Sequence, residues 1–372
     1  MKYYIIAGEA SGDLHGSNLI KALYKEDAKA DIRCWGGDLM QEAGGTLVKH
    51  YKERAFMGFV EVLTNLSKVL GFIKFCKEDI AEFHPDVIIF IDNSGFNLRI
   101  AKWAKKEGFR THYYISPQVW ASRAGRVKEI KRDVDKMFVI LPFEKEFYRK
   151  YKYEVQFVGH PLIDGIAGRK QVDEKKFRQE NNLNNSPIIA LLPGSRRQEI
   201  TKMLSVMLSL VHDFSDYQFV IAGAPSQEFS FYQQIIGTKK VSFIKNKTYD
   251  LLSVSYAALV ASGTATLEAA LFKVPQVVCY KGSAISYQIA KRIVTLKFIS
   301  LVNLIMDREV VKELIQKDFN KENLSLALNN ILEENYRNKL FSDYYELEKI
   351  LGGKGASQKV AKEIIKELRL NT

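Results

Sequence analysis

The sequence is poor in cysteine and proline and has no long apolar run. Its 372 residues include only eight prolines and three cysteines, Cys34, Cys76 and Cys279. The scattered cysteines fit neither a disulfide framework nor a zinc site, so a reducing compartment is expected. No stretch reaches the roughly 18 apolar residues of a membrane-spanning helix, and the N-terminal apolar core of about five residues is too short for a signal peptide. These absences predict a soluble or at most peripheral protein.

Signature motifs of several enzyme classes are also missing. The sequence contains no H-E-x-x-H and no C-x-x-C, so it does not imply a bound metal. No G-x-S-x-G is present to indicate a serine hydrolase. The absence of G-x-x-x-x-G-K-[ST] and of G-x-G-x-x-G argues against a P-loop kinase and against a standard dinucleotide-binding enzyme.

Positive charge is abundant and unevenly distributed. The formal net charge is +12, and residues 99–136 hold eleven Lys or Arg against four acids. Such a surplus suits an anionic partner: a nucleic acid, an acidic membrane surface or a phosphorylated substrate. The alternative is a solvated basic face that has no partner.

Short apolar runs alternate with helical patterns along most of the chain. Because 372 residues exceed the size at which a single core stops growing, two domains are expected. Strand–helix alternation indicates parallel sheets with helices on both faces, so the fold class is α/β. The two halves meet near GHPLIDG at 159–165, and the end of the chain, roughly 320–372, is helical and charged. The expected strands are Tyr3–Ala7, Val87–Ile91, His112–Ile115, Met137–Leu141 and Val155–Val158 in the first half, and Ile188–Leu192, Gln218–Ala222, Val241–Phe243, Ala258–Ala261 and Gln276–Cys279 in the second.

A glycine-rich turn, IIAGEASGDLHG at 5–16, follows the first expected strand. Its glycines, Gly8, Gly12 and Gly16, stand four residues apart. Turns of this kind at the start of a helix often hold a phosphate, so the first interpretation is a nucleotide site. His15 in this turn and His160 at the junction could each touch a ligand, although lone histidines are usually structural.

The strand at 87–91 leads directly into Asp92. A carboxylate at the C-terminal edge of a parallel sheet lies where such folds bind ligands. Asp92 could therefore take a proton from an attacking hydroxyl group. The alternative is a turn or capping aspartate, because Asn93, Ser94 and Gly95 form a good turn.

The turn LLPGSRR in the second half is suited to phosphate. Gly194 permits a tight turn after a buried strand, and Ser195 and Arg196 stand at the start of a helix. The free amides and positive dipole end of that helix favour an anion, and Arg196 adds a bidentate donor that fits a diphosphate. The alternative is an ordinary strand–helix turn with exposed arginines.

A second such turn, ASGTATLE, begins another helix after Gly263. Thr264 and Thr266 can cap this helix or bind phosphate oxygens. Glu268, one turn further, can accept both hydroxyls of a ribose, as acidic residues do in other nucleotide-binding folds. Alternatively, Glu268 compensates the helix dipole. The helix starts at Ser195 and Thr264 could converge on one diphosphate.

The segment 55–75 is unusually apolar. Its helical stripe packs in the core under one interpretation and faces acyl chains or a membrane under the other, with Lys68, Lys74 and Lys77 near lipid phosphates. The stripe consists of Phe59, Val62, Leu63, Leu66, Val69, Leu70 and Ile73, widened by Phe56, Met57, Phe72 and Phe75.

Taken in order, the motifs resemble one family. The segments GEASGDLHG, FMGFVEVL, PDVIIFIDNSGFN, YYISPQVWAS, LPFEKEFY, GHPLID, LLPGSR, ASGTATLEAAL and VKELIQ follow one another from residue 8 to residue 316. Together they resemble the lipid-A-disaccharide synthase family of lipopolysaccharide assembly. Any one motif alone would be weak, but the ordered set is specific.

The resemblance implies a GT-B fold, in which two Rossmann-like domains face each other across a cleft. It implies an acceptor domain at 1–165 and a UDP-sugar domain with C-terminal helices at 166–372. The implied reaction transfers 2,3-diacylglucosamine from UDP to the 6-hydroxyl of 2,3-diacylglucosamine 1-phosphate (lipid X), with inversion and without a metal or other cofactor. The implied partners are these substrates and the cytoplasmic face of the inner membrane, to which a cytoplasmic enzyme would bind peripherally, and a homodimer with exchanged C-terminal segments is suggested.

The resemblance also assigns residues to the two substrates. Asp92 and Arg196 are expected to be catalytic, and Gly8–Gly16 becomes the acceptor side. The UDP-binding residues are expected to be Gly194, Ser195, Arg196, Gly223, Tyr280, Gly263, Thr264, Ala265, Thr266 and Glu268. The acceptor-binding residues are expected to be Gly8, Glu9, Ser11, Gly12, Asp13 and His15. A downstream motif adds Asn303, Glu313 and Gln316 to the same cleft.

This sequence departs from the family pattern at one position, and three alternative functions remain open. Some relatives carry a second aspartate where this chain has Gly95, so Asp92 is expected to act alone. The UDP-GlcNAc 2-epimerases and the peptidoglycan lipid II transferase share the fold and are alternative enzymes. A basic RNA-binding protein is a rival of another class, but the chain lacks an aromatic–basic RNA-binding motif, so no nucleic-acid partner is expected.

Overall fold

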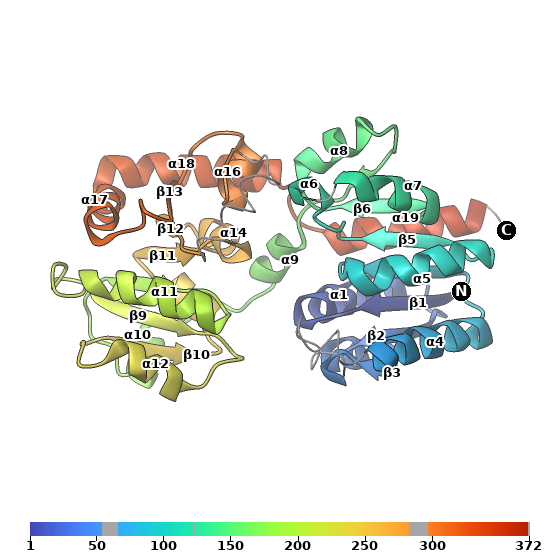
Figure 1. Ribbon diagram of the computed structural model, residues 1–372, viewed down its shortest axis with the longest axis horizontal. Coiled ribbons are helices and arrows are strands. Elements are labelled where there is room, and N and C mark those ends of the chain that lie inside the picture. The colour runs from blue at the N-terminus through green and yellow to red at the C-terminus, as the bar shows by residue number, and fades with distance from the viewer. Residues whose placement is uncertain (54–65, 123, 283–296, 371–372) are drawn as a thin grey trace. The chain divides into compact units, whose positions relative to one another are not determined.

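The computed structural model describes residues 1–53, 66–122, 124–282 and 297–370, which form two compact units (Figure 1). The first unit comprises Met1–Asp164 together with the chain from Leu351 onward, and the second comprises Gly165–Ile350. Each unit contains its own parallel sheet flanked by helices. The expected α/β class with two Rossmann-like domains is thus confirmed.

The first unit is built on a seven-stranded sheet in the order β3-β2-β1-β4-β5-β6-β7. Its strands are β1 (Lys2–Ala7), β2 (Asp31–Gly36), β3 (Thr46–His50), β4 (Val87–Ile91), β5 (Thr111–Tyr114), β6 (Lys136–Val139) and β7 (Gln156–Phe157). Its helices are α1 (Ala10–Glu26), α2 (Asp38–Glu42), α4 (Leu66–Phe83), α5 (Ser94–Lys106), α6 (Val119–Ser122), α7 (Val127–Asp133), α8 (Pro142–Arg149) and α19 (Ala356–Leu370), and the chain enters the second unit within α9 (Pro161–Ala167).

The second unit is built on a six-stranded sheet in the order β10-β9-β8-β11-β12-β13. Its strands are β8 (Ile188–Leu192), β9 (Gln218–Gly223), β10 (Ser242–Lys245), β11 (Ala257–Ala261), β12 (Gln276–Tyr280) and β13 (Lys312–Ile315). Its helices are α10 (Glu174–Glu180), α11 (Arg197–Met207), α12 (Phe229–Ile236), α13 (Thr248–Ser253), α14 (Thr264–Leu271), α16 (Leu301–Met306), α17 (Lys321–Leu332) and α18 (Glu334–Ile350).

The central strands are apolar along their whole length because both faces of each sheet are covered. In β1, Tyr3 and Ile5 pack in the core that α1 and α19 cover, whereas Tyr4 and Ile6 pack in the core that α4 and α5 cover. Parallel strands buried on both faces read as continuous apolar runs rather than as alternating patterns. These runs are therefore the strands that the sequence predicts most clearly.

Three strands, β2, β3 and β13, were not expected from the sequence. The strands β3 and β13 lie at sheet edges, where partly exposed polar residues interrupt the apolar pattern. The strand β2 carries Arg33, whose guanidinium lies 2.7 Å from the Asp79 carboxylate of α4. The sequence also shows a helical pattern at 284–294; this segment and the first part of the 55–75 segment lie outside the described residues.

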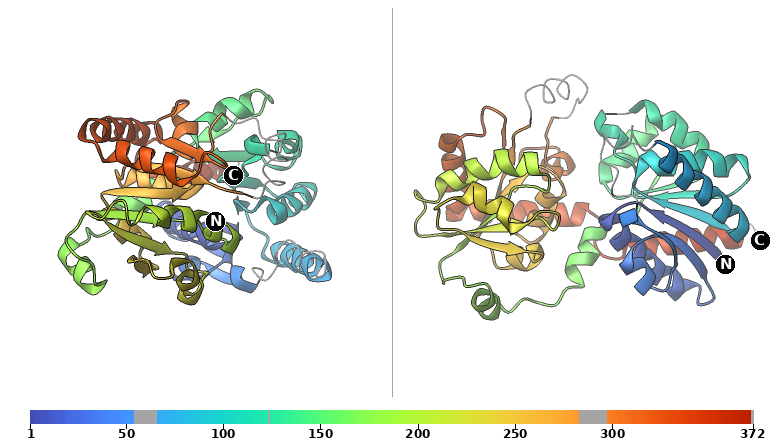
Figure 2. Two further views of the ribbon diagram at one scale, coloured as in Figure 1. Left: turned by 60° about the vertical axis from the view of Figure 1, so that its left-hand side comes forward. Right: turned by 60° about the horizontal axis from the view of Figure 1, so that its bottom comes forward.

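The C-terminal helix differs from the expected domain boundaries, which placed all of 166–372 in the second domain. The helix α19 packs against α1 in the first unit (Figure 1 and Figure 2). Its apolar face, with Val360, Ile364 and Leu368, is buried in the core of the first unit. At its end, Glu367 pairs with Lys136 at 2.8 Å and with His112 at 3.2 Å. An amphipathic pattern predicts such a helix, but only packing decides which sheet it covers.

Candidate functional site

The strand order of the first sheet reverses between its two central strands, β1 and β4. These strands pair in parallel, with Ala7 opposite Ile91 at their C-terminal ends. Open α/β sheets bind ligands at the carboxyl edge where the strand order reverses. The residues that follow these ends, Gly8–Glu9 and Asp92–Asn93, therefore occupy the position in this unit best suited to a ligand.

The turn after β4 has an unusual backbone that its neighbours stabilise. Asp92 and Asn93 have φ values of 43° and 45°, in the left-handed region that non-glycine residues rarely adopt. The Asp92 carbonyl accepts hydrogen bonds from the Tyr113 hydroxyl and, at 2.8 Å, from the Asn97 side-chain amide. A Cβ atom on Gly8 would lie 2.0 Å from the side-chain Nδ2 atom of Asn93, so this turn requires glycine at position 8.

Asp92 is paired with Glu9 and does not stand alone. Burial together with the charge of the nearby Glu9 raises the pKa of Asp92 to about 6. A carboxylate with a raised pKa is a stronger base and is still largely ionised at pH 7. Glu9 therefore places a second carboxylate near Asp92 from the neighbouring strand end, although Gly95 carries none. The expectation that Asp92 acts alone as the base stays a prediction.

The other residues expected to bind the acceptor divide into two groups. Ser11 is exposed on the first turn of α1, whereas Gly12 is buried, with its Cβ position 3.1 Å from the Ala7 Cβ. Asp13 is also buried, and its carboxylate accepts hydrogen bonds from the amides of Gly37, Leu39 and Met40 at 2.7, 3.2 and 3.1 Å. The contacts of Asp13 thus stabilise the β2–α2 turn and give no support to acceptor binding.

His15 is unsuited to bind a phosphate as a cation. Burial lowers the pKa of His15 to about 4, and burial with the nearby His15 lowers the pKa of His160 to about 3. The His160 Nδ1 atom accepts a hydrogen bond from the Leu162 amide at 3.3 Å. Both imidazoles are therefore neutral at pH 7.

In the second sheet the strand order reverses between β8 and β11, which pair with Leu192 opposite Val260. Both strands lead into turns that the sequence singles out. Gly194 has a φ of 101°, which explains the glycine there. Ser195 is exposed, and Arg196 immediately precedes α11 with its Nη1 atom 2.8 Å from the Glu199 carboxylate. The two predicted helix starts thus follow two strands that are neighbours in the sheet.

Of the two threonines that follow β11, Thr264 is exposed and Thr266 is buried. Gly263 has a φ of 151° and precedes α14, whose first residue, Thr264, is exposed and is followed by half-buried Ala265. Thr266 is fully buried, and its hydroxyl donates to the Gly263 carbonyl at 2.8 Å. Thr264 is therefore suited to a phosphate, whereas the Thr266 hydroxyl serves the turn itself.

Glu268 lies on α14, one turn beyond Thr264. Its Oε1 atom accepts a hydrogen bond from the Tyr249 hydroxyl of α13 at 2.8 Å. Burial raises the pKa of Glu268, and the hydrogen bond from Tyr249 acts in the opposite direction. A half-buried carboxylate at this edge of the sheet is suited to accept hydroxyl donors of a sugar.

The last two residues expected to bind UDP end the strands on either side of β8 and β11. Gly223 ends β9, where a Cβ atom would lie 2.2 Å from the Phe243 ring, so its glycine makes room for that ring. Tyr280 ends β12, and its carbonyl accepts a hydrogen bond from the Gln316 amide at 2.8 Å.

Asn303 and Glu313 form a structural cluster at α16. The Glu313 carboxylate accepts hydrogen bonds from the Ile299 and Ser300 amides, both at 2.9 Å, and from the Asn303 side chain at 2.8 Å. The Asn303 Oδ1 atom in turn accepts from two further backbone amides. These contacts give both side chains a structural role, because they connect the start of α16 to β13. Gln316 follows β13 with a φ of 55°.

With this geometry described, comparison with known proteins gives the family. A model of the family described as Lipid-A-disaccharide synthetase matches residues 3–367. The chain belongs to the lipid-A-disaccharide synthetase family. The Lipid-A-disaccharide synthase of Syntrophus aciditrophicus (strain SB) is 38% identical over 365 residues, 96% of this chain and 95% of that protein. That of Coxiella burnetii (strain CbuG_Q212) is 35% identical over 366 residues, 97% of this chain and 96% of that protein.

Solved structures share the fold of this synthetase-family chain at low sequence identity. The UDP-GlcNAc 2-epimerase from Neisseria meningitidis bound to UDP-GlcNAc matches with a TM-score of 0.73 at 14% identity, over 98% of this chain and 100% of that chain. The glycotransferase of kitacinnamycin matches with a TM-score of 0.64 at 13% identity, over 99% and 98%. At these identities the likeness shows the GT-B arrangement alone, so it does not favour epimerase chemistry for a member of the synthetase family.

Three residues of this synthetase-family chain were missed by the sequence interpretation. Tyr113 and Asn97 hold the Asp92 turn, and Tyr249 holds Glu268. The only sequence signal was position: Asn97 lies in the NSGFN turn and Tyr113 in the strand next to β4. Tyr249 lies on a short helix with no motif, so its contact arises only from folding.

Proposed function

We propose that the chain is an inverting glycosyltransferase that forms the lipid A disaccharide. It transfers 2,3-diacylglucosamine from UDP to the 6-hydroxyl of lipid X and yields the β-1,6-linked disaccharide 1-phosphate and UDP. The observation that carries this proposal is the family match over residues 3–367. The chemistry of the two strand-reversal points supports it, because one carries carboxylates and the other carries an arginine and two helix starts.

In the proposed reaction the first unit supplies the base. Asp92 accepts the proton of the acceptor 6-hydroxyl as that oxygen attacks C1 of the donor sugar. The new C1–O bond forms while the bond from C1 to the UDP oxygen breaks, so a single displacement inverts the anomeric centre. The raised pKa of Asp92, caused by burial and by the Glu9 charge, supports this role.

The second unit is proposed to bind the departing UDP without a metal. The diphosphate gains negative charge as the bond to C1 breaks, and preorganised donors stabilise such charge. The Arg196 guanidinium and the amides at the start of α11 and α14 are the donors suited to it. Glu268 is suited to the ribose hydroxyls, and Gly223 and Tyr280 flank these turns at the ends of β9 and β12.

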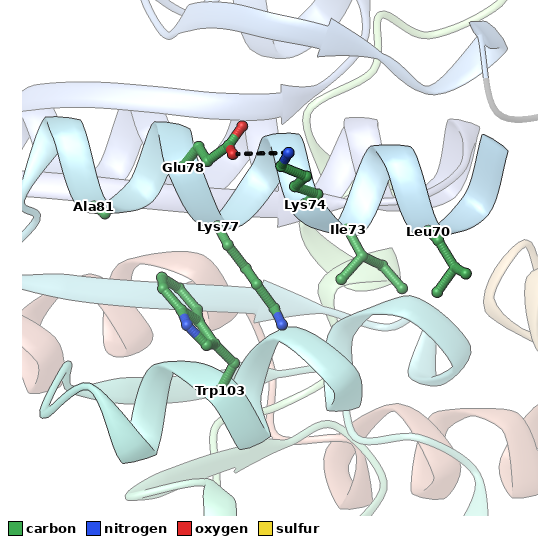
Figure 3. Close-up of a pocket in the computed structure, with 7 residues that line it drawn as sticks. All are labelled: Leu70, Ile73, Lys74, Lys77, Glu78, Ala81 and Trp103. Carbon is green, nitrogen blue, oxygen red and sulfur yellow. Dashed lines mark ion pairs between the residues drawn. The ribbon is translucent and has the colours of Figure 1, made fainter. Parts of the chain in front are cut away.

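The acyl chains suggest a membrane-facing surface on the first unit. Leu70 and Phe75 on α4 are 57% and 41% exposed, whereas Phe72 and Ile73 pack against the core. A groove of about 470 Å³ runs between α4 and α5, and Figure 3 shows Leu70, Ile73 and Lys77 pointing from α4 toward α5. Apolar side chains beside lysines fit a lipid surface.

The basic stretch at 99–136 adds charge to the same unit. Lys102 and Lys106 on α5 and Lys128 on α7 are exposed, while Lys105 and Arg132 form ion pairs with acids. Among the described helices, none is both long and apolar enough to cross a membrane. We therefore propose peripheral binding to the cytoplasmic face of the inner membrane. The homodimer with exchanged C-terminal segments stays a prediction that sedimentation of the purified chain would test.

The decisive experiment incubates the purified protein with UDP-2,3-diacylglucosamine and lipid X. Disaccharide 1-phosphate and UDP are expected in equal amounts, and chelation with EDTA is expected to leave the rate unchanged. Formation of neither product would overturn the proposed function. Conversion of UDP-GlcNAc to its 2-epimer would favour the epimerase alternative instead.

A further inference from the structure

Tyr249 of α13 contacts Glu268 and two further side chains of the second unit, Phe272 and Arg169. The Tyr249 hydroxyl donates to Glu268 Oε1 at 2.8 Å, and the Tyr249 ring contacts the Phe272 ring at a centroid distance of 5.3 Å. The Arg169 guanidinium lies 5.2 Å from the centre of the Tyr249 ring and forms an ion pair with Asp250, the next residue of α13. These contacts restrict the position of the Tyr249 ring.

A carboxylate that accepts ribose hydroxyls must be ionised and correctly rotated. Burial opposes the ionised form of Glu268, because a desolvated charge is unfavourable unless it is hydrogen-bonded. The Tyr249 hydroxyl supplies such a bond and also restricts rotation of the carboxylate. One oxygen of Glu268 is thereby held by the protein before any nucleotide arrives.

We propose that Tyr249 is a positioning residue that prepares Glu268 to distinguish nucleotides by their ribose hydroxyl groups. The proposal rests on the proposed binding of UDP by the second unit. Arg169 and Phe272 act on the same ring, and they keep its hydroxyl directed at Glu268. Removal of the Tyr249 hydroxyl should therefore weaken recognition of the ribose without affecting recognition of the diphosphate.

The test compares two nucleotides by calorimetry on the full chain, UDP and 2′,3′-dideoxyuridine diphosphate, which lacks both ribose hydroxyls. The unaltered protein is expected to bind UDP about 10- to 100-fold more tightly, as hydrogen bonds to a charged group allow. In Tyr249→Phe the preference for UDP should fall about 5-fold or more, while the affinity for the dideoxy nucleotide stays the same. A purely structural role of Tyr249 would weaken both nucleotides equally.

Two further variants complete the design. Tyr345→Phe removes a hydroxyl from an exposed tyrosine of the same unit, 58% exposed on α18, and should keep the full preference. Glu268→Gln should lose most of the preference, and adding Tyr249→Phe to it should cause little further change, because both act through one carboxylate. If Tyr249→Phe does not fold, Tyr249→Met, which also lacks a donor, takes its place with the same expectations.

The outcomes separate this inference from the proposed function. No measurable UDP binding by the unaltered protein would overturn the proposed function, because that function requires the second unit to bind UDP. UDP binding with no preference over the dideoxy nucleotide would overturn ribose recognition by Glu268 and, with it, the inference. A full preference retained in Tyr249→Phe would overturn the positioning role of Tyr249 alone and leave the proposed function intact.

Discussion

The two units use the same sheet topology at their strand-reversal points but carry opposite chemistry there. In the first unit, the ends of β1 and β4 present Glu9 and Asp92, and burial together with the Glu9 charge raises the pKa of Asp92. In the second, the ends of β8 and β11 lead into the glycine turns before α11 and α14, with Arg196 beside them. A shared topology thus offers the same position for a ligand in each unit, and the side chains after the strands differ in the ligand that they suit.

The largest effect is expected from the first unit. Asp92→Asn removes the proposed base, so kcat should fall by about 10²- to 10⁴-fold, the usual contribution of a general base. UDP binding, measured by calorimetry, should stay the same because we propose that the second unit binds UDP. The matched control is Asp216→Asn, which alters an exposed aspartate of the second unit and should leave kcat unchanged. A variant at position 92 with the unaltered kcat would remove Asp92 from the mechanism.

The second unit should respond differently to loss of its cation. Arg196→Ala is expected to lower kcat about 10²- to 10³-fold, as loss of a preorganised charge-stabilising donor does, and to weaken UDP binding as well. The neighbouring Arg197, which lies 4.5 Å from the centre of the Phe231 ring, provides the control. If Arg197→Ala and Arg196→Ala lower the rate equally, the effect belongs to general charge and not to a specific donor.

Membrane binding should also distinguish the units. Fully burying a Leu or Phe side chain contributes about 1.5–3 kcal/mol. Because about half of each side chain is exposed, the double variant Leu70→Ser and Phe75→Ser should bind phosphatidylglycerol vesicles about 10- to 100-fold more weakly. Leu326→Ser alters a leucine on α17 that is 65% exposed and belongs to the second unit, and should have no effect in the same co-sedimentation assay. Equal losses in both variants would contradict a membrane surface confined to the first unit.

The smallest effect concerns the carboxylate pair. Because the Glu9 charge raises the pKa of Asp92, which stands at about 6, Glu9→Gln should lower it and keep Asp92 ionised in more acidic solution. The acid limb of the profile of log kcat against pH should therefore shift toward lower pH by roughly one unit or less, whether or not the maximal rate changes. Movement toward higher pH would show that Glu9 does not act as a charged neighbour of Asp92.

Much of the second unit's candidate site could be predicted from the sequence because its signals are local. Gly194, Ser195 and Arg196 follow an apolar run and precede a helix, and the structure places them as that pattern requires. The acceptor side was harder to predict. Asp13 looks like a surface carboxylate in the motif, yet amides 24 to 27 residues away use its oxygens.

The sequence by itself determined the family, the α/β class and the turns that are suited to ligands, because periodicity and turn residues act over a few positions. Only the tertiary structure decided that Glu9 meets Asp92, that Tyr249 meets Glu268 and that α19 covers the first sheet rather than the second. Each of these depends on which strands become neighbours or which face a helix buries. Such contacts join residues far apart along the chain, and no local pattern carries them.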